Sequence, residues 1–305
     1  MKKKVVLTGA GGFIGRHTIE YMLEKGYRVH AVDNTAHPDL NYKDKIFWHS
    51  CDLMDANQQK SLLNEVRPTH LLHFAWVTIP GKYWTSPDNF RWVTASLNLL
   101  SNFGSYGGHR VILAGTCAEY DWSYGYCSET ITPTRPSTLY GVCKNSLQEM
   151  SEHLCKQNSL SRAWGRIFFL YGPHEHPSRL VPSVINSLLR RKIAHCSHGK
   201  QIRDFLYVKD AARAFVDLLD SEITGPINIA SGQPVFLKDF ILEITKKLKK
   251  EKLIKFDKKP LQEEPPLVVG DIRRLRDEVG FKLKYTLENG LDETIQYWRN
   301  LIKNK

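Results

Sequence analysis

The sequence lacks the long apolar segments that mark membrane and secreted proteins. Its 305 residues contain no apolar run long enough to cross a bilayer. The start, MKKKVVLTGAGG, is basic and then apolar, but glycines interrupt the short apolar run and no small-residue cleavage site follows. We therefore interpret this start as a buried strand, and we expect a cytoplasmic protein with no membrane partner.

Metal-site spacing and nucleic-acid-binding motifs are also missing. The six cysteines form no CxxC pair and no zinc-type spacing with histidine, so we expect reduced thiols. His174 and His176 have no evident third ligand, and no metal is predicted. No zinc finger, RNP-type aromatic motif or clear helix-turn-helix is present, so no nucleic-acid partner is expected.

Composition and charge describe an ordinary globular chain with a basic balance. Hydrophobic residues make up 42% and charged residues 25%, which argues against disorder and allows a sizeable core. The net charge is +11, and much of the excess lies in residues 246–259, a pattern typical of a solvated helix face and loop. The charge is compatible with nucleic acid, acidic lipid or a phosphorylated small molecule, and is weak evidence for any of them.

Apolar strand-like runs alternate with helical patterns through the first two-thirds of the chain. This alternation predicts an α/β fold with a Rossmann-type, doubly wound parallel sheet covered on both faces. We expect residues 1–172 and about 205–232 to form the larger domain, and about 173–204 and 233–305 to form a smaller C-terminal lobe. The predicted strands are 4–8, 29–32, 46–49, 70–74, 111–114 and 163–168, and the main predicted helices are 13–25, 58–65, 89–103, 140–156 and 181–191.

A glycine-rich turn follows the first predicted strand and opens the first predicted helix. In VVLTGAGGFIGRH, Gly9, Gly12 and Gly15 have the spacing GxxGxxG. Glycines there let the backbone approach a pyrophosphate, and the helix N-terminus supplies free N–H groups. Asp33 ends the second strand, where a carboxylate accepts hydrogen bonds from an adenosine ribose and repels a 2′-phosphate. The pattern predicts a dinucleotide site that prefers NAD to NADP; a glycine turn with a capping aspartate is the simpler alternative.

Tyr140 and Lys144 lie four residues apart in LYGVCKNS, so a helix places them on one face. Taken alone, this spacing is more typical of an amphipathic surface pair. The other interpretation is a proton-donating phenol beside an ammonium. Because a phenol has a pKa of about 10 and a nearby ammonium favours the phenolate, such a pair suits proton transfer.

Four motifs occur in a fixed order: TGAGGFIG, LLHFAW after the fourth strand, LAGTCAEY at the end of the fifth, and LYGVCK on the next helix. Together they resemble the extended short-chain dehydrogenase/reductase family, in its NAD-dependent epimerase/dehydratase branch, from residue 4 to about residue 298. The resemblance implies an NAD-dependent enzyme whose larger domain binds the dinucleotide and whose smaller lobe binds the substrate. It also implies a homodimer formed through helices 89–103 and 140–156.

The resemblance assigns site residues by position. Thr116, Tyr140 and Lys144 match the catalytic set: the tyrosine transfers a proton, the threonine bonds the same substrate oxygen, and the lysine holds the nicotinamide ribose. Lys144 and the bound nicotinamide would both favour the Tyr140 phenolate. Arg203 is expected to meet the diphosphate of the substrate. The expected cofactor contacts are Gly9, Gly12, Phe13, Ile14, Gly15, Asp33, Asn34, Asp52, Leu53, Ala75, Tyr140 and Lys144.

The late motifs YGPHEHPSRLVP, GKQIRDFLYVKDAARAF and NIASGQPVFLKDF resemble the nucleotide-sugar branch, especially enzymes that reduce 4-keto-6-deoxyhexoses, such as CDP-abequose synthases. The implied reaction is NAD(P)-dependent reduction at C4 of a nucleoside-diphosphate sugar, with Tyr140 as proton donor. Dehydratases of this branch carry Asp-Glu after the catalytic threonine, whereas this chain has Cys117-Ala118, with Glu119 one place late and on a different side. An NAD-dependent 4-epimerase is the alternative.

A few positions bear on that choice. Epimerases often have asparagine where Phe169 stands, and an arginine expected just before Asp271 is absent, with Arg273 or Arg274 as candidate replacements. Asp33 points the other way, because epimerases hold NAD tightly whereas reductases often use NADPH.

The segment HFAWVTIPGKYWTSPDNFRW is unusually aromatic. Its rings could narrow the sugar pocket, with core packing and a loop anchor as the alternative; they are Trp76, Tyr83, Trp84 and Trp92. Trp84 is expected either to border the sugar, as a substrate-binding residue, or to anchor a loop. Trp92 lies in a helical pattern and is expected in the core.

Overall fold

The computed structural model describes residues 3–34, 42–257 and 264–303. Its centre is a parallel sheet of seven strands in the order β11-β7-β5-β4-β1-β2-β3. The chain leaves β1 toward one edge and returns to form β4 on the other side of β1, so the strand order reverses there. Ligands of such sheets bind at the carboxyl ends of the strands beside this reversal. The strands are β1 (Lys4–Thr8), β2 (Arg28–Asp33), β3 (Phe47–Ser50), β4 (His70–His73), β5 (Arg110–Thr116), β7 (Ser161–Ile167) and β11 (Gly225–Ile229).

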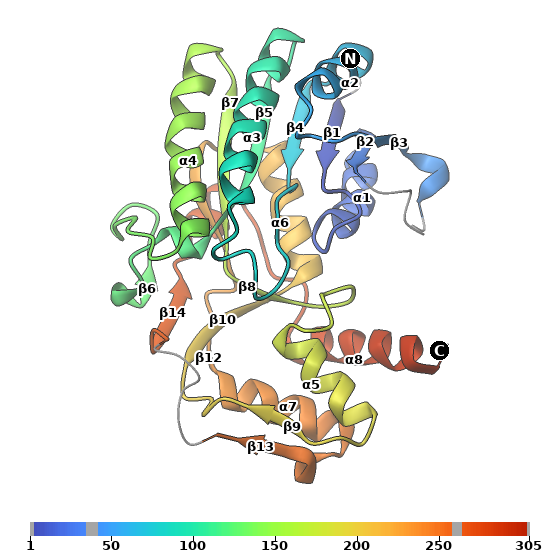
Figure 1. The fold of residues 1–305 in the computed structure, drawn as a ribbon, viewed down its shortest axis with the longest axis vertical. Helices are drawn as coiled ribbons and strands as arrows, with labels where there is room; N and C mark the ends of the chain where they lie inside the picture. The colour runs from blue at the N-terminus through green and yellow to red at the C-terminus, as the bar shows by residue number, and fades with distance from the viewer. Residues whose placement is uncertain (1–2, 35–41, 258–263, 304–305) are drawn as a thin grey trace.

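Helices cover both faces of this sheet (Figure 1). On one face, α1 (Gly15–Glu24) packs against α6 (Val208–Asp220); on the other, α3 (Asp88–Ser105) contacts both α2 (Ala56–Val66) and α4 (Leu139–Gln157). Each layer has its own hydrophobic core. The doubly wound α/β fold expected from the strand–helix alternation is therefore confirmed.

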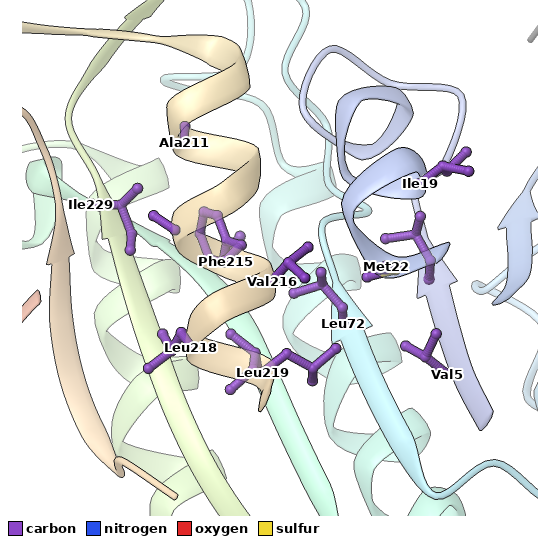
Figure 2. Packing of buried hydrophobic residues seen from close by; sticks show 14 of the residues in the cluster. Val5, Ile19, Met22, Leu72, Ala211, Phe215, Val216, Leu218, Leu219 and Ile229 are labelled. Carbon is purple, nitrogen blue, oxygen red and sulfur yellow. The ribbon is translucent and has the colours of Figure 1, made fainter. Parts of the chain in front are cut away.

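The core beneath α1 and α6 shows why these segments are helices. Ala211, Phe215 and Leu218 recur at helical spacing on α6 and are completely buried. Figure 2 shows that they lie between their helix and the sheet, alongside apolar side chains of α1. Burying such a face contributes roughly 25 cal/mol for each Å² of apolar surface removed from water. The side chains labelled in this view are Val5, Ile19, Met22, Leu72, Ala211, Phe215, Val216, Leu218, Leu219 and Ile229.

A second sheet and three helices form the C-terminal lobe below the carboxyl ends of the central strands (Figure 1). In this sheet β10 lies between β12 and β14, β8 also pairs with β10, and β6 pairs with β14. β6 comes from within residues 1–172, so that part of the chain also contributes to the second sheet. The elements are β6 (Tyr126–Cys127), β8 (Phe169–Tyr171), β10 (Ile202–Tyr207), β12 (Pro234–Phe236), β14 (Leu267–Gly270), the pair β9 (Ala194–Cys196) and β13 (Ile254–Phe256), and helices α5 (Leu180–Leu189), α7 (Leu237–Leu248) and α8 (Leu287–Lys303).

Two further features of the described chain bear on the expectations from sequence. All six cysteines are buried and unpaired. Across residues 3–34, 42–257 and 264–303, no helix has the length and apolar character needed to cross a membrane. Of the basic run 246–259, the last two lysines lie outside the described residues.

Candidate active site

The glycine turn is closely packed where β1 meets α1 and β4. Gly9 has φ +66°, and a Cβ there would lie 2.9 Å from the backbone nitrogen of Ala75. A Cβ on Gly15 would lie 2.2 Å from the carbonyl oxygen of Gly9, so no larger residue fits. Gly12 is exposed at the tip of the turn. The structure thus places the turn directly beside Ala75, at the strand-order reversal.

The end of β2 is tied to the same turn. The Asp33 carboxylate accepts hydrogen bonds from the backbone N–H groups of Gly11, at 3.0 Å, and Asn34, at 2.9 Å. On the other side of the turn, the Arg16 guanidinium donates to the carbonyl oxygen of Gly11 at 3.1 Å. The predicted ribose acceptor therefore lies at the turn that is predicted to hold the pyrophosphate.

The residues present fit a dinucleotide. Helix α1 begins at Gly15 with neither a side-chain cap nor an acidic residue in its first turn, so its N-terminus favours an anion. Phe13 and Ile14 lie between the glycines, partly buried. After β3, at the same sheet edge as Asp33, Leu53 is buried and Asp52 is exposed. These positions would hold NAD through its pyrophosphate and its adenosine end.

Tyr140 lies in the first turn of α4, which begins after the N-cap Thr138. Its backbone N–H donates to the carbonyl oxygen of Trp84 at 3.1 Å, and its ring meets the rings of Tyr83 and Trp84 edge-on, at centroid distances of 4.9 and 5.6 Å. Its hydroxyl lies near the side chain of Thr116, at the end of β5, close enough for Thr116 to affect the pKa of the phenol. The structure therefore brings the predicted phenol and the predicted threonine close together.

The pKa of Tyr140 is raised well above its ordinary value by burial, and the neighbouring Tyr83 adds to the rise. The interaction with Thr116 lowers the pKa and so acts in the opposite direction. In the protein without its cofactor, burial is the largest effect on the pKa of Tyr140. That Lys144 and the bound nicotinamide together favour the phenolate stays a prediction.

Lys144 lies one turn further along α4, and its side chain is directed at β5 and at an indole ring. The ammonium donates to the carbonyl oxygen of Ala114 at 2.9 Å, and it lies 3.6 Å from the centroid of the Trp76 ring. Burial lowers the pKa of Lys144 to about 7, while the negative charge of Glu119 opposes this shift. The alternative interpretation, an exposed amphipathic pair, is excluded, because Lys144 is 4% exposed.

Glu119 is completely buried, and its carboxylate has partners within the protein. Its carboxylate accepts from the backbone N–H of Thr116 at 2.7 Å, from Nε of Arg166 at 2.7 Å and from the indole N–H of Trp164 at 3.0 Å. Arg166 in turn donates to the Tyr120 hydroxyl at 3.0 Å. Glu119 therefore holds the end of β5 in place, and its predicted position on a different side from the phenol stays a prediction.

Arg203 already has partners inside the protein. Its guanidinium donates to the carbonyl oxygens of Ile202 and Pro265, each at 2.9 Å, and to Glu264 at 3.2 Å. Arg203 is 6% exposed and lies over the Phe169 ring, 5.4 Å from its centroid. Its predicted contact with a diphosphate stays a prediction, and a ligand there would meet a cation now neutralised by Glu264.

Sequence reasoning did not assign Arg179 or Cys117 to the site, whereas Tyr83 belonged to the aromatic segment expected near the sugar. Tyr83 is buried against Tyr140, and Arg179 from the C-terminal lobe lies 5.2 Å from the Tyr83 ring centroid. Cys117 is close enough to both tyrosines to raise their pKa values. The aromatic segment signalled Tyr83, but no local pattern distinguished Arg179 from other loop arginines.

Other candidates have structural partners elsewhere. Arg274 donates to the carbonyl oxygen of Pro226 and pairs with Glu278, and Arg273 pairs with Asp271. These partners give no support to either arginine as a replacement for the one missing before β14.

The two loop histidines and Trp92 also have neighbours. His174 contacts Arg16 and the Tyr297 hydroxyl, and His176 bonds Ser178. Trp92 stacks on Trp76 in the core beneath α3. Within the described residues, no group of three or more histidine, cysteine or acidic side chains is placed to hold a metal ion.

A dinucleotide cradle and a threonine–tyrosine–lysine cluster thus share the carboxyl edge of one parallel sheet, because β1, β4 and β5 are neighbours. This arrangement defines an α/β enzyme that uses a nicotinamide dinucleotide for redox chemistry. The chain belongs to the NAD dependent epimerase/dehydratase family, whose model matches residues 5–230. The expected family, its enzymatic character and its cofactor, NAD, are confirmed.

Several relatives extend over almost the whole chain. UDP-glucuronic acid decarboxylase 1 of Xenopus tropicalis is 26% identical, covering 100% of this chain and 74% of its own. dTDP-4-dehydro-6-deoxyglucose reductase of Escherichia coli is 24% identical, covering 97% of each. Among solved structures, UDP-N-acetylglucosamine 4-epimerase of Methanobrevibacter ruminantium M1 superposes with a TM-score of 0.88 at 24% identity, over 100% of both chains. The names of these three proteins describe different reactions, namely decarboxylation, reduction and epimerisation, each on a nucleotide sugar.

Proposed function

We propose that the protein reduces a nucleoside-diphosphate 4-keto-6-deoxyhexose at C4, with Tyr140 as the proton donor. The observation that carries the proposal is the placement of Tyr140, in the first turn of α4, beside Thr116 at the edge of the dinucleotide cradle. Bound NADH would supply the hydride to C4. Thr116 would orient the carbonyl oxygen, and Tyr140 would give that oxygen its proton. Burial suits this role, because it keeps the phenol protonated until the oxygen gains negative charge.

The lining around the tyrosine supports a deoxysugar. Tyr83 and Trp84 present rings, and Cys117 presents a thiol whose pKa burial raises, so it stays neutral. A methyl group is better accommodated by such a lining than a carboxylate, which would lose its hydration. Glu119, the nearest carboxylate to Thr116, is committed to Arg166 and is not available as a base for water elimination.

Arg203 and Arg179 are the proposed contacts for the anionic part of the substrate. Arg203 would exchange Glu264 for a phosphate oxygen, whereas Arg179 is partly exposed and faces Tyr83 from the C-terminal lobe. Trp84 is proposed to border the sugar, since its ring and its carbonyl both contact Tyr140.

An NAD-dependent 4-epimerase is the second candidate, favoured by Asp33 at the glycine turn, which suits NAD. The two reactions are separated by the cofactor balance. We would incubate the protein with NADH and a panel of nucleotide-linked 4-keto sugars, hexoses and UDP-glucuronate, and follow the absorbance of reduced nicotinamide together with product identity. Oxidation of NADH in proportion to product supports the reductase. Two outcomes contradict the reductase. One is product formed without a net change in added cofactor, and the other is no product from any keto sugar.

We also propose a cytoplasmic homodimer formed through α3 and α4. These helices pack side by side and present Phe90, Val142 and Met150 to solvent, with 57%, 43% and 49% of each residue exposed. Three apolar side chains on neighbouring helices form the kind of surface that a second copy would cover.

A further inference from the structure

Lys144 sits against the face of Trp76, the residue that follows Ala75 at the end of β4. The ammonium lies 3.6 Å from the indole centroid and 2.9 Å from the carbonyl oxygen of Ala114, its hydrogen-bond acceptor. The negative face of an aromatic ring attracts a cation most strongly where water is excluded. With 4% of Lys144 exposed, the indole replaces part of the hydration that the ammonium loses on burial.

Trp76 is itself held in place, so the position of its ring is well determined. Its indole N–H donates to the side-chain oxygen of Asn89 at 2.8 Å, and the amide nitrogen of Asn89 donates to the carbonyl oxygens of Tyr83 and Ser86, each at 2.8 Å. Asn89 is completely buried. Because Tyr83 packs on Tyr140, these contacts link the lysine to the tyrosine through residues 76–89 as well as along α4.

We propose that Trp76 is a positioning residue that keeps Lys144 charged and fixed at the end of β5, for contact with the nicotinamide ribose. The proposal deepens the proposed function and rests on it for the identity of the ligand. Nothing in the family resemblance assigned Trp76 a role: the match at LLHFAW concerned only the backbone of Ala75.

The other groups around Lys144 do not account for its charge by themselves. Glu119 favours the ammonium, yet burial still lowers the pKa of Lys144 to about 7. His73 on β4 faces the same region, but its pKa is lowered to about 3 by burial and by Lys144, so it is neutral. Tyr140, one turn away, is protonated as well. Removing the indole face would therefore leave the ammonium with Glu119 and one carbonyl oxygen.

The test is a titration of Lys144 by NMR in the full-length protein with isotope-labelled lysine. The resonance missing from Lys144→Met identifies the residue. A cation–π contact is worth about 0.5–1 kcal/mol at exposed sites and about 2 kcal/mol when desolvated, and 1.36 kcal/mol equals one pKa unit. Trp76→Leu should therefore lower the Lys144 pKa by roughly 0.4–1.5 units, toward the upper end because the contact is buried. Trp76→Phe, which keeps an aromatic face, should give a smaller shift. Because a neutral lysine loses its charge-assisted bond to ribose, NAD affinity near neutral pH should fall in the same order.

Trp92→Leu is the matched control, since Trp92 stacks on Trp76, and it is the Trp76 ring over which Lys144 lies. It removes the same bulk from the same core and should leave the Lys144 pKa near the wild-type value. An unchanged or raised pKa in Trp76→Leu, equal shifts in the leucine and phenylalanine variants, or an equal shift in Trp92→Leu would each overturn the proposal. If the wild type fails to bind NAD or reduce any sugar, the proposed function fails while the titration still decides the role of Trp76.

Discussion

The buried pair of Glu119 and Arg166 allows a stability prediction whose magnitude follows from the structure. Glu119 is 0% exposed and Arg166 is 3% exposed, and their atoms meet at 2.7 Å. Glu119→Gln keeps the shape and the acceptor for the Thr116 N–H, but it leaves the guanidinium without its counter-charge. It also turns an amide N–H₂ toward two donors, Arg166 and Trp164.

Breaking such a buried pair typically costs about 3–5 kcal/mol, whereas an exposed pair contributes about 0–1 kcal/mol. We expect Glu119→Gln to lower the free energy of unfolding by about 3–5 kcal/mol, a large part of the about 5–15 kcal/mol that domains have. Urea titration followed by circular dichroism and tryptophan fluorescence measures this change. Glu149→Gln, at an exposed position of α4, is the control and should stay within about 0.5 kcal/mol of wild type.

A double variant identifies the source of the cost. In Glu119→Gln with Arg166→Met, no uncompensated cation remains, so it should be more stable than Glu119→Gln alone. A loss below about 1 kcal/mol in the single variant, or a double variant less stable than the single one, would refute this reasoning.

The remaining predictions concern turnover, cofactor choice, pH and assembly. Tyr140→Phe keeps the ring packing but deletes the proton donor, so kcat should fall by about 10²–10⁴-fold while NAD affinity barely changes. Near-wild-type turnover by this variant would contradict the proposed mechanism. Asp33→Ser should reduce the preference for NAD over NADP in calorimetry, and tighter NADP binding by the wild type would contradict the role of Asp33. Burial lowers several histidine pKa values in the folded state, so the unfolded chain takes up more protons as the pH falls from 6.5 to about 4. The free energy of unfolding should therefore drop as the pH falls through that window. Glu175 acts in the opposite direction, because burial raises its pKa to about 8. Urea midpoints that rise with acidification would contradict the expected drop in stability. The histidines of this pH prediction are His17, His30, His70 and His174, each with a pKa lowered to about 4, and His73, with a pKa lowered to about 3. Met150→Lys should shift the protein toward monomer in light scattering, and a monomeric wild type would contradict the proposed dimer.

Local patterns were sufficient to predict the larger domain and the identity of most site residues. Apolar periodicity located β1 at 4–8 and the helices α1 to α5 to within a few residues, because each element buries one face and its periodicity follows from that burial. The glycine turn could also be predicted from the sequence, since Gly9 and Gly15 lie where a Cβ would collide with backbone atoms.

Tertiary structure decided what lies beside these residues. The short strands β6, β10 and β14 pair across long stretches of chain, and their pairing depends on packing rather than on any local signal. The same holds for Trp76 against Lys144 and for Glu119 against Arg166. Spacing on a helix correctly put Tyr140 and Lys144 on one face, but it could not tell that burial raises the pKa of the phenol and lowers that of the amine. Burial is a property of the whole fold, so the sign of each shift was settled only when β4, β5 and α4 came together.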